Sequence, residues 1–265
     1  MDAIDEYKTV CEKAARAAGA VLLDWAGRFS AREKGPSDLV TEADLAAQEV
    51  IRQQVLGVFP DHGFLAEEQN ANIASQADGL RWIVDPLDGT MNYVHGVPNY
   101  AVSIALEQRG QLLVGTVLDP VNGECFTAAF GHGAWLNGRR LSVSAACELS
   151  QALVAASFPA RVERNNREIA DFIEVTVRAQ GTRRMGSSAL NLCYVAAGRF
   201  DGYWSTSTKT WDIAAGALMV LEAGGVISHY GGGPLDLARP QFIAAATPRL
   251  HNELRGLLHA PAAAS

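Results

Sequence analysis

The sequence predicts a mixed α and β protein, with helices and a meandering sheet in its first half and an α/β arrangement in its second. Three observations support this. Residues 2–26 repeat apolar side chains at the three- and four-residue spacing of an amphipathic helix. Residues 63–144 hold short apolar runs separated by Gly, Pro or Asn-Gly. After residue 152, strand-like and helix-like segments alternate.

Two helices are expected first. The helix over residues 2–26 has an apolar face that includes Ile4, Tyr7, Ala14, Ala18, Val21, Leu22 and Trp25. The segment EKGPSD breaks it. A second helix runs from near Thr41 to about Val58, with Val50, Ile51 and Val55 on its apolar side, and FPDHG ends it.

Six strands are expected next, at residues 63–68, 81–85, 100–107, 111–119, 123–130 and 133–144. Asn137-Gly138 within the last of these is typical of a two-residue hairpin turn. The short runs and frequent turn residues favour a sheet whose consecutive strands lie side by side.

The second half predicts alternating elements. Strands are expected at 152–158, 181–186, 201–205 and 241–247, and helices at 165–179, 187–198, 212–223 and 248–259. Gly224-Gly225 matches a helix C-cap, and Pro248 suits the first turn of the last helix. We place a soft boundary between residues 1–148 and 149–265, and expect the two halves to form one compact unit.

Composition excludes several classes of protein. The chain has 265 residues, 48% of them hydrophobic and 19% charged, which suits a globular protein with a sizeable core. Its net charge of −7, without a basic patch, argues against nucleic-acid binding. No apolar run is long enough to span a membrane. Four widely spaced cysteines and a start without signal-peptide features predict a cytoplasmic protein with reduced thiols.

Two aspartates in RWIVDPLDGTMNYVHG stand at the end of an apolar strand. Asp85 ends WIVD, and Pro86 is expected to turn the chain. Asp88 then suits the N-cap of a helix, and Gly89 lets the backbone approach a ligand. Taken alone, a turn and a cap explain this pair about as well as a site does. Two adjacent carboxylates beside an anion-binding helix start make sense with Mg²⁺ between them.

Further acids stand at other element ends. Glu67 and Glu68 follow the strand GFLA, and Asp212 begins an apolar helix, where it could be an N-cap. Asp44 lies three residues after Thr41, so a capping box is the leading interpretation for it. Several acids at the ends of apolar elements are hard to explain as unrelated caps, which favours a metal site.

These segments together resemble the inositol monophosphatase family, part of the lithium-sensitive, metal-dependent phosphatase superfamily. The similarity covers almost the whole chain. It is carried by DLVTEAD, FLAEE, WIVDPLDGTMNYVHGVPNYAVSIAL, GTVLDPVNGECFTAAFGHGAWLNGRRLSVS, RRMGSSALNLCYVAAGRFDGYW and WDIAAGALMVLEAGG, in the order and spacing of the family. D-P-[LI]-D-G-T with a distant W-D and E-A-G-G is a highly specific combination.

The resemblance implies the layered αβαβα sandwich of the inositol monophosphatase/fructose-bisphosphatase type, usually a homodimer. It also implies two or three Mg²⁺ ions per active site. Glu67, Asp85 and the carbonyl of Leu87 would hold one ion. Asp85, Asp88 and Asp212 would hold a second, and a third, weaker ion would lie near Glu67.

The family pattern also assigns the other site residues. The phosphate would rest on the metals and on the N–H groups of Gly89 and Thr90. Thr90, paired with Asp44, would help to activate the attacking water, so these two and Glu67 form the expected catalytic set. Lys34 belongs to a loop that closes over the site in relatives. The substrate pocket would be lined by Gly186, Ser187 and Ser188.

The substrate implied first is inositol 1-phosphate, because GTMNYVHGVP resembles the T-N-[FY]-x-H form of inositol monophosphatases. The chain departs from the family at Ser205, where inositol-binding members usually have a glutamate. A neutral serine predicts broader selectivity for the alcohol. A histidinol-phosphate or broad sugar- or polyol-phosphate phosphatase is therefore an alternative. A non-catalytic partner of the transcription machinery is a second. Cys193 and His95 are catalytic candidates by residue type alone.

Overall fold

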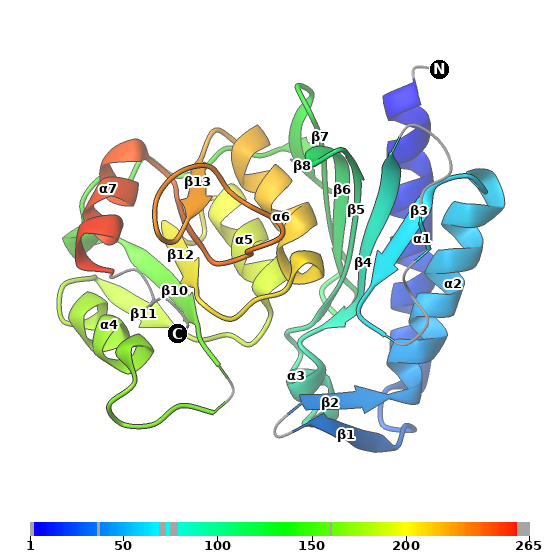
Figure 1. Cartoon of the computed structure of the whole chain (residues 1–265), viewed down its shortest axis with the longest axis horizontal. Helices are drawn as coiled ribbons and strands as arrows, with labels where there is room; N and C mark the ends of the chain where they lie inside the picture. Colours follow the sequence, from blue (N-terminus) through cyan, green and yellow to red (C-terminus); the bar gives the residue numbers. More distant parts are fainter. Residues whose placement is uncertain (1–2, 36–37, 69–72, 75–78, 160, 259–265) are drawn as a thin grey trace.

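Five layers make up the protein, in the order helices, sheet, helices, sheet, helices (Figure 1). The structure is a computed structural model that describes residues 3–35, 38–68, 73–74, 79–159 and 161–258. This arrangement is the αβαβα sandwich expected from the sequence, and the predicted fold class is confirmed. No helix in the described part of the chain is both long and apolar enough to cross a membrane.

The first two layers are a helix pair and a large mixed sheet. α1 (Ala3–Trp25) and α2 (Glu42–Val58) match the expected helices, and both pack against the sheet (Figure 1). The sheet has the order β3-β4-β5-β6-β7-β8-β9. Its strands are β3 (Gly63–Ala66), β4 (Leu80–Asp88), β5 (Ala101–Gln108), β6 (Gln111–Asp119), β7 (Glu124–Ala129), β8 (Gly133–Leu136) and β9 (Arg139–Arg140).

Most neighbours in this sheet are antiparallel, as the run of short strands predicts. β3 and β4 are the exception, because they are parallel. The predicted hairpin turn at Asn137-Gly138 is confirmed: both residues have positive φ, 48° and 79°, between β8 and β9. The expected strand over 133–144 is therefore two short strands, and the chain leaves the sheet after Arg140.

A two-stranded hairpin lies where the sequence predicted only a helix break. β1 (Ala31–Gly35) pairs antiparallel with β2 (Asp38–Thr41), which leads directly into α2. The segment lacks the apolar alternation of a strand, which is why the periodicity missed it.

The strand that carries the paired aspartates differs from the prediction. β4 does not end at Asp85 but continues to Asp88, and its pairing with β5 shifts register between Asp85 and Asp88. Pro86 is tolerated because it lies in this irregularity, where no ladder N–H is required. Asp88 is consequently not a helix N-cap. Gly89, at φ 97°, is the N-cap of the short helix α3 (Thr90–Val94).

The second sheet has the order β11-β10-β12-β14-β13. β10 (Leu153–Ser157) is parallel to both β11 (Gly181–Arg183) and β12 (Gly202–Ser205), whereas β14 (Phe242–Ala245) is antiparallel to β12 and to β13 (Val226–His229). β13 was not predicted, because the four residues VISH are too short a run to give a clear period.

Helices α5 (Ser188–Ala196) and α6 (Thr210–Glu222) form the middle layer between the two sheets (Figure 1). One hydrophobic core joins both helices to the inner faces of both sheets. Close approach depends on glycine: a Cβ on Gly216 of α6 would lie 2.6 Å from the Cβ of Leu192 in α5.

The outermost layer holds α4 (Arg167–Thr176) and α7 (Pro248–Leu257), with a 3₁₀ turn at Leu149–Gln151. α7 begins with Pro248 as predicted, and α6 ends before Gly224, whose φ is 90°. The division of the chain at residues 148 and 149 stays a prediction.

Candidate active site

Four acidic residues, two from β4 and one each from the end of β3 and from α6, gather at one edge of the large sheet. Asp85 and Asp88 lie near the carboxyl end of β4 and are 2% and 7% exposed. Glu67 directly follows β3, and its N–H bonds to the carbonyl of Val84, which places it beside that end of β4. Asp212 reaches the same place from the first turn of α6.

Asp85 shows most clearly that these carboxylates are close. Its pKa is raised well above the ordinary value, first by burial and then by the negative charges of Glu67, Asp88 and Asp212. The N–H of Leu87 donates to Asp85 Oδ1 at 3.0 Å and opposes that shift. Like charges that lie this close together in a buried place favour a cation between them.

Asp88 is held by the beginning of α5. Ser187 Oγ and the N–H of Ala189 donate to Asp88 Oδ2, the latter at 2.7 Å, and the N–H of Ser188 donates to Oδ1 at 3.2 Å. These bonds and the helix N-terminus favour the ionised form. Burial outweighs them, and raises the pKa of Asp88 to about 6.

Asp212 is not the N-cap of α6, as one interpretation of the sequence had it, because the helix begins at Thr210. The Asp212 carboxylate instead accepts from the N–H of Lys209 at 2.8 Å. Burial, followed by the charge of Asp88, raises its pKa well above the ordinary value. Asp212 is thus the third residue of the helix, and its carboxylate both accepts from the N-cap backbone and faces the acidic cluster.

Asp85, Asp88 and Asp212 each accept hydrogen bonds from nearby backbone N–H groups. Among the residues that the structure describes, no three His, Cys, Asp or Glu side chains are arranged as a finished metal-ligand set. The donor chemistry nevertheless fits a hard divalent cation, because several carboxylates repel one another in a buried place. The cluster therefore has the type of ligand that Mg²⁺ prefers.

Asp44 and Thr90 lie next to this cluster. The predicted capping box is confirmed: Thr41 N and Thr41 Oγ1 donate to Asp44 Oδ2 at 2.8 and 2.6 Å. Asp44 Oδ1 is 3.4 Å from the hydroxyl of Thr90, which is also 3.1 Å from the carbonyl of Leu87. Asp44 is fully buried, so one carboxylate both caps α2 and contacts Thr90.

Two glycines allow the halves of the chain to meet here. A Cβ on Gly89 would lie 3.3 Å from the carbonyl of Gly186, whose φ is 89°. Asn92 and Asn99 fix this contact, since their amides donate to the carbonyl of Met185 at 2.8 and 3.0 Å. Neither asparagine was expected at the site from the sequence. Asn92 stands in the motif DGTMNYVHG, but its role depends on a residue 93 positions later.

The serines assigned to the substrate pocket have different surroundings. Ser187 is the N-cap of α5 and bonds Asp88, and the Ser188 hydroxyl lies 3.0 Å from the hydroxyl of Tyr203. Ser205 is fully buried at the end of β12, and its Oγ accepts from Ser207 N at 3.4 Å. Lys34 lies in β1, and its side chain is outside the described part of the structure.

The surroundings of the two residues considered by type alone do not favour a catalytic role. His95 is exposed at the C-cap of α3. Cys193 is fully buried in α5, and burial raises the pKa of its thiol well above the ordinary value. A thiol in this state is a poor nucleophile.

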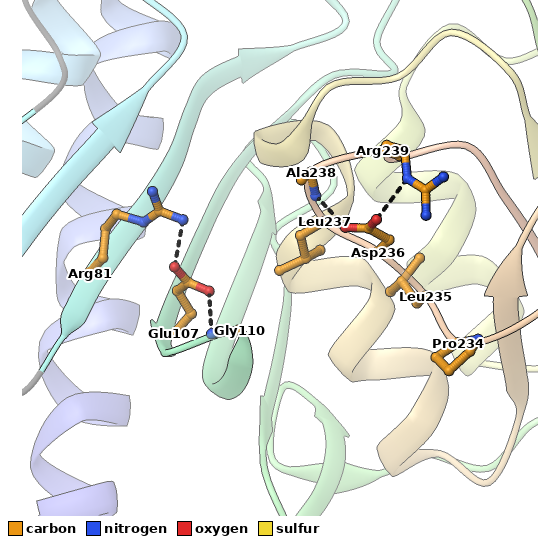
Figure 2. Close-up of a pocket in the computed structure, with 9 residues that line it drawn as sticks. All are labelled: Arg81, Glu107, Gly110, Pro234, Leu235, Asp236, Leu237, Ala238 and Arg239. Atoms are coloured by element: carbon orange, nitrogen blue, oxygen red, sulfur yellow. Dashed lines mark hydrogen bonds and ion pairs between the residues drawn. The ribbon is translucent and has the colours of Figure 1, made fainter.

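A cavity of about 520 Å³ lies at the opposite end of β4 (Figure 2). Arg81 and Glu107 line one side and form an ion pair of 2.5 Å, while Asp236 and Arg239 pair at 2.8 Å across it. Its acids are already matched by arginines, so this cavity does not offer the charge of a divalent-cation site.

A family model described as the inositol monophosphatase family matches residues 3–261. The chain is 41% identical over 231 residues to inositol-1-monophosphatase of Rhizobium meliloti (strain 1021), which covers 86% of this chain and 85% of that protein. It is also 41% identical over 243 residues to a Pseudomonas aeruginosa protein named Nus factor SuhB, with 89% of each chain covered.

The fold gives the same assignment. The crystal structure of extragenic suppressor protein suhB from Bartonella henselae has a TM-score of 0.90 to this structure at 39% identity, and the match covers 96% of this chain and 98% of that chain. With the family model matching nearly its whole length, the chain belongs to the inositol monophosphatase family.

Proposed function

We propose that the protein is a Mg²⁺-dependent phosphatase that hydrolyses a small phosphate monoester, with inositol 1-phosphate as the first candidate. Relatives named inositol-1-monophosphatase support a phosphatase, and the family is generally metal-dependent. The observation that carries the proposal is the group formed by the buried Asp85 and Asp88 with the partly exposed Glu67 and Asp212, because the charges of the other three acids raise the pKa of Asp85.

Five groups would hold the metal. Glu67, Asp85 and the Leu87 carbonyl form one ligand set, and Asp85, Asp88 and Asp212 form the other, so Asp85 is common to both. Bound Mg²⁺ would lower the pKa of a coordinated water and neutralise charge on the phosphoryl oxygens. Lithium would then inhibit the enzyme by competing for the set that includes Asp212.

Thr90 and Asp44 would orient the attacking water. The Thr90 hydroxyl is placed to donate to Asp44 or to the Leu87 carbonyl, which leaves its lone pairs able to accept from water. Asp44 is fixed by two bonds from Thr41, so the position of its second oxygen is well defined. The N–H groups of Gly89 and Thr90 would contact the phosphate.

A substrate panel tests the proposal. Purified protein with Mg²⁺ should release phosphate from inositol 1-phosphate, and EDTA should abolish the release. Glycerol 2-phosphate, histidinol phosphate and sugar phosphates distinguish the alternatives. Preference for histidinol phosphate would replace the inositol assignment, and no release from any monoester would overturn the phosphatase proposal.

The second candidate is a binding function in transcription, because one relative is named Nus factor SuhB. The chain retains every acidic residue that the catalytic proposal needs, which favours an enzyme. If the protein bound a transcription factor but released no phosphate, the binding function would be the better conclusion. The homodimer also stays part of this proposal, and size-exclusion chromatography with light scattering measures it.

A further inference from the structure

The ends of β10 and β12 form a wall beside the acidic cluster. Ser157 is in register with Ser205, so these two serines end adjacent parallel strands at the same sheet edge. The Tyr203 hydroxyl lies 2.9 Å from Ser157 Oγ and 3.0 Å from Ser188 Oγ, and the N–H of Ser188 bonds Asp88. A continuous series of contacts therefore leads from Asp88 to the ends of both strands.

Ser205 itself does not supply a polar group to this wall. Ser205 has no exposed surface, and its side chain is short. The next residue, Thr206, is partly exposed, and its carbonyl accepts from the side chain of Gln241 at 3.3 Å. The polar groups that a ligand can reach at this point therefore begin at Thr206.

Glu168 meets Thr206 at the same point, although it belongs to α4 on the outer face of the sheet. The Thr206 hydroxyl donates to Glu168 Oε1 at 3.4 Å. Among the described residues this is the one hydrogen bond to the Glu168 carboxylate, so Oε2 is still able to accept. A contact this long is weak, and a ligand hydroxyl can compete with it.

The start of α4 carries a second acid one turn later. Asp171 is 2% exposed; its Oδ2 accepts from the Tyr230 hydroxyl at 2.7 Å, while its Oδ1 is buried with no partner among the described residues. Glu168 precedes Asp171 by three residues, so both side chains lie on the same side of α4. Asp171 is too buried for a ligand to reach, so of these two acids only Glu168 is exposed enough to accept from a ligand hydroxyl.

We propose that Glu168 determines specificity, by accepting hydrogen bonds from hydroxyl groups on the alcohol part of a polyol phosphate. It would supply, from α4, the carboxylate that relatives have at the position of Ser205. The inference rests on the proposed phosphatase function and deepens it. The broader selectivity expected from Ser205 alone is then replaced by selection for polyhydroxylated monoesters.

Steady-state kinetics of the full chain with Mg²⁺ test this, using inositol 1-phosphate and 4-nitrophenyl phosphate, an ester with no hydroxyl group on its alcohol part. Glu168→Gln should lower kcat/KM for inositol 1-phosphate by roughly tenfold or more, mainly through KM, because a charge-assisted hydrogen bond is lost. The rate with 4-nitrophenyl phosphate should change by less than about twofold, which also shows that the variant is folded.

Two further variants sharpen the result. Glu174→Gln is the matched control, because Glu174 lies on the same helix but pairs with Arg178 on the surface. It should leave both substrates unaffected. Thr206→Val should produce a smaller loss than Glu168→Gln, again confined to inositol 1-phosphate.

The outcomes separate this inference from the function on which it rests. If the wild-type chain hydrolyses neither ester, the phosphatase proposal fails, and the role of Glu168 fails with it. If the wild type is active but Glu168→Gln leaves inositol 1-phosphate unaffected, or slows both esters equally, the role of Glu168 alone is overturned.

Discussion

The carboxylate of Asp88 accepts hydrogen bonds from groups that come 99 to 101 residues later in the chain. Asp88, at the end of β4 in the first half of the chain, is thus bound to the first turn of α5 in the second half. The bonds fix the carboxylate in place, and burial still raises its pKa to about 6. An aspartate in this setting gains stability as an anion when a cation is beside it.

His62 is expected to contribute a stability that is lost in mild acid. Its ring stacks on Phe59 at 4.8 Å, and burial lowers its pKa below the ordinary value, with Asp61 opposing the shift. The unfolded chain therefore binds a proton more readily, so the stability present above about pH 6.5 is lost as the pH falls. His62→Phe should reduce this dependence, as measured by urea unfolding between about pH 5 and 8.

Burial also lowers the pKa of His251. The dependence of the unfolding free energy on pH should therefore decrease in His62→Phe rather than vanish. The raised pKa values of Asp85, Asp88 and Asp212 act with the opposite sign, so the test is the difference between variant and wild type. An unchanged slope in His62→Phe would contradict this role for the buried histidine.

The cysteines differ in predicted reactivity. Burial raises the pKa of Cys11 to about 12 and that of Cys125 to about 11, and Cys193 is shifted in the same direction, whereas Cys147 is partly exposed. One thiol per chain should react rapidly with Ellman's reagent at about pH 8 under native conditions. Cys147→Ser should remove that fast phase, and fast labelling of several thiols in the wild type would be the contrary result.

At the scale of elements, strand β4 shows where sequence reasoning succeeds and where it stops. The apolar run and the two aspartates predict a buried strand that ends in a site, and the structure has the strand, with both acids buried near its end. The sequence also suggested a turn at Pro86, but the irregular pairing with β5 carries the strand on to Asp88. Such a register shift depends on the partner strand, which local composition does not specify.

The close contact between α5 and α6 predicts that a larger residue at Gly216 destabilises the protein. Gly216→Ala places a methyl group against Leu192, so it should destabilise the protein by about 1–3 kcal/mol, although alanine is the better helix former. Gly57→Ala is the control, since no heavy atom lies within 4 Å of its added Cβ; it should be neutral or stabilise by up to about 1 kcal/mol. Chemical denaturation of both variants measures the difference, and equal effects would argue against close helix packing.

At the scale of the molecule, most of the architecture could be predicted, because periodicity locates the helices and turn residues separate the strands. The candidate site was predictable in its acids, which stand at element ends in specific motifs. The roles of Asn92, Asn99 and Glu168 could not be predicted, since each forms a hydrogen bond with a residue that is close only after folding. Short elements such as β1 and β13 were missed for lack of a clear period.

The shared middle layer predicts that the first half cannot fold alone. Ile83, Val117 and Phe126 belong to the same core as α5 and α6, so a fragment of residues 1–148 would expose that face of the large sheet. The fragment should aggregate or lack cooperative unfolding by circular dichroism, whereas the full chain should unfold in one transition. A monomeric fragment with a cooperative transition would show instead that the first half is autonomous.

The central claim is that the acidic cluster binds the metal that activates hydrolysis. Phosphate release from inositol 1-phosphate, measured against Mg²⁺ concentration for wild type and Asp88→Asn, tests it most directly. The wild type should show a saturable requirement for Mg²⁺, and the folded variant should lose roughly a hundredfold or more of its activity because one ligand charge is removed. Full activity in Asp88→Asn, or wild-type release that needs no divalent cation, would contradict it.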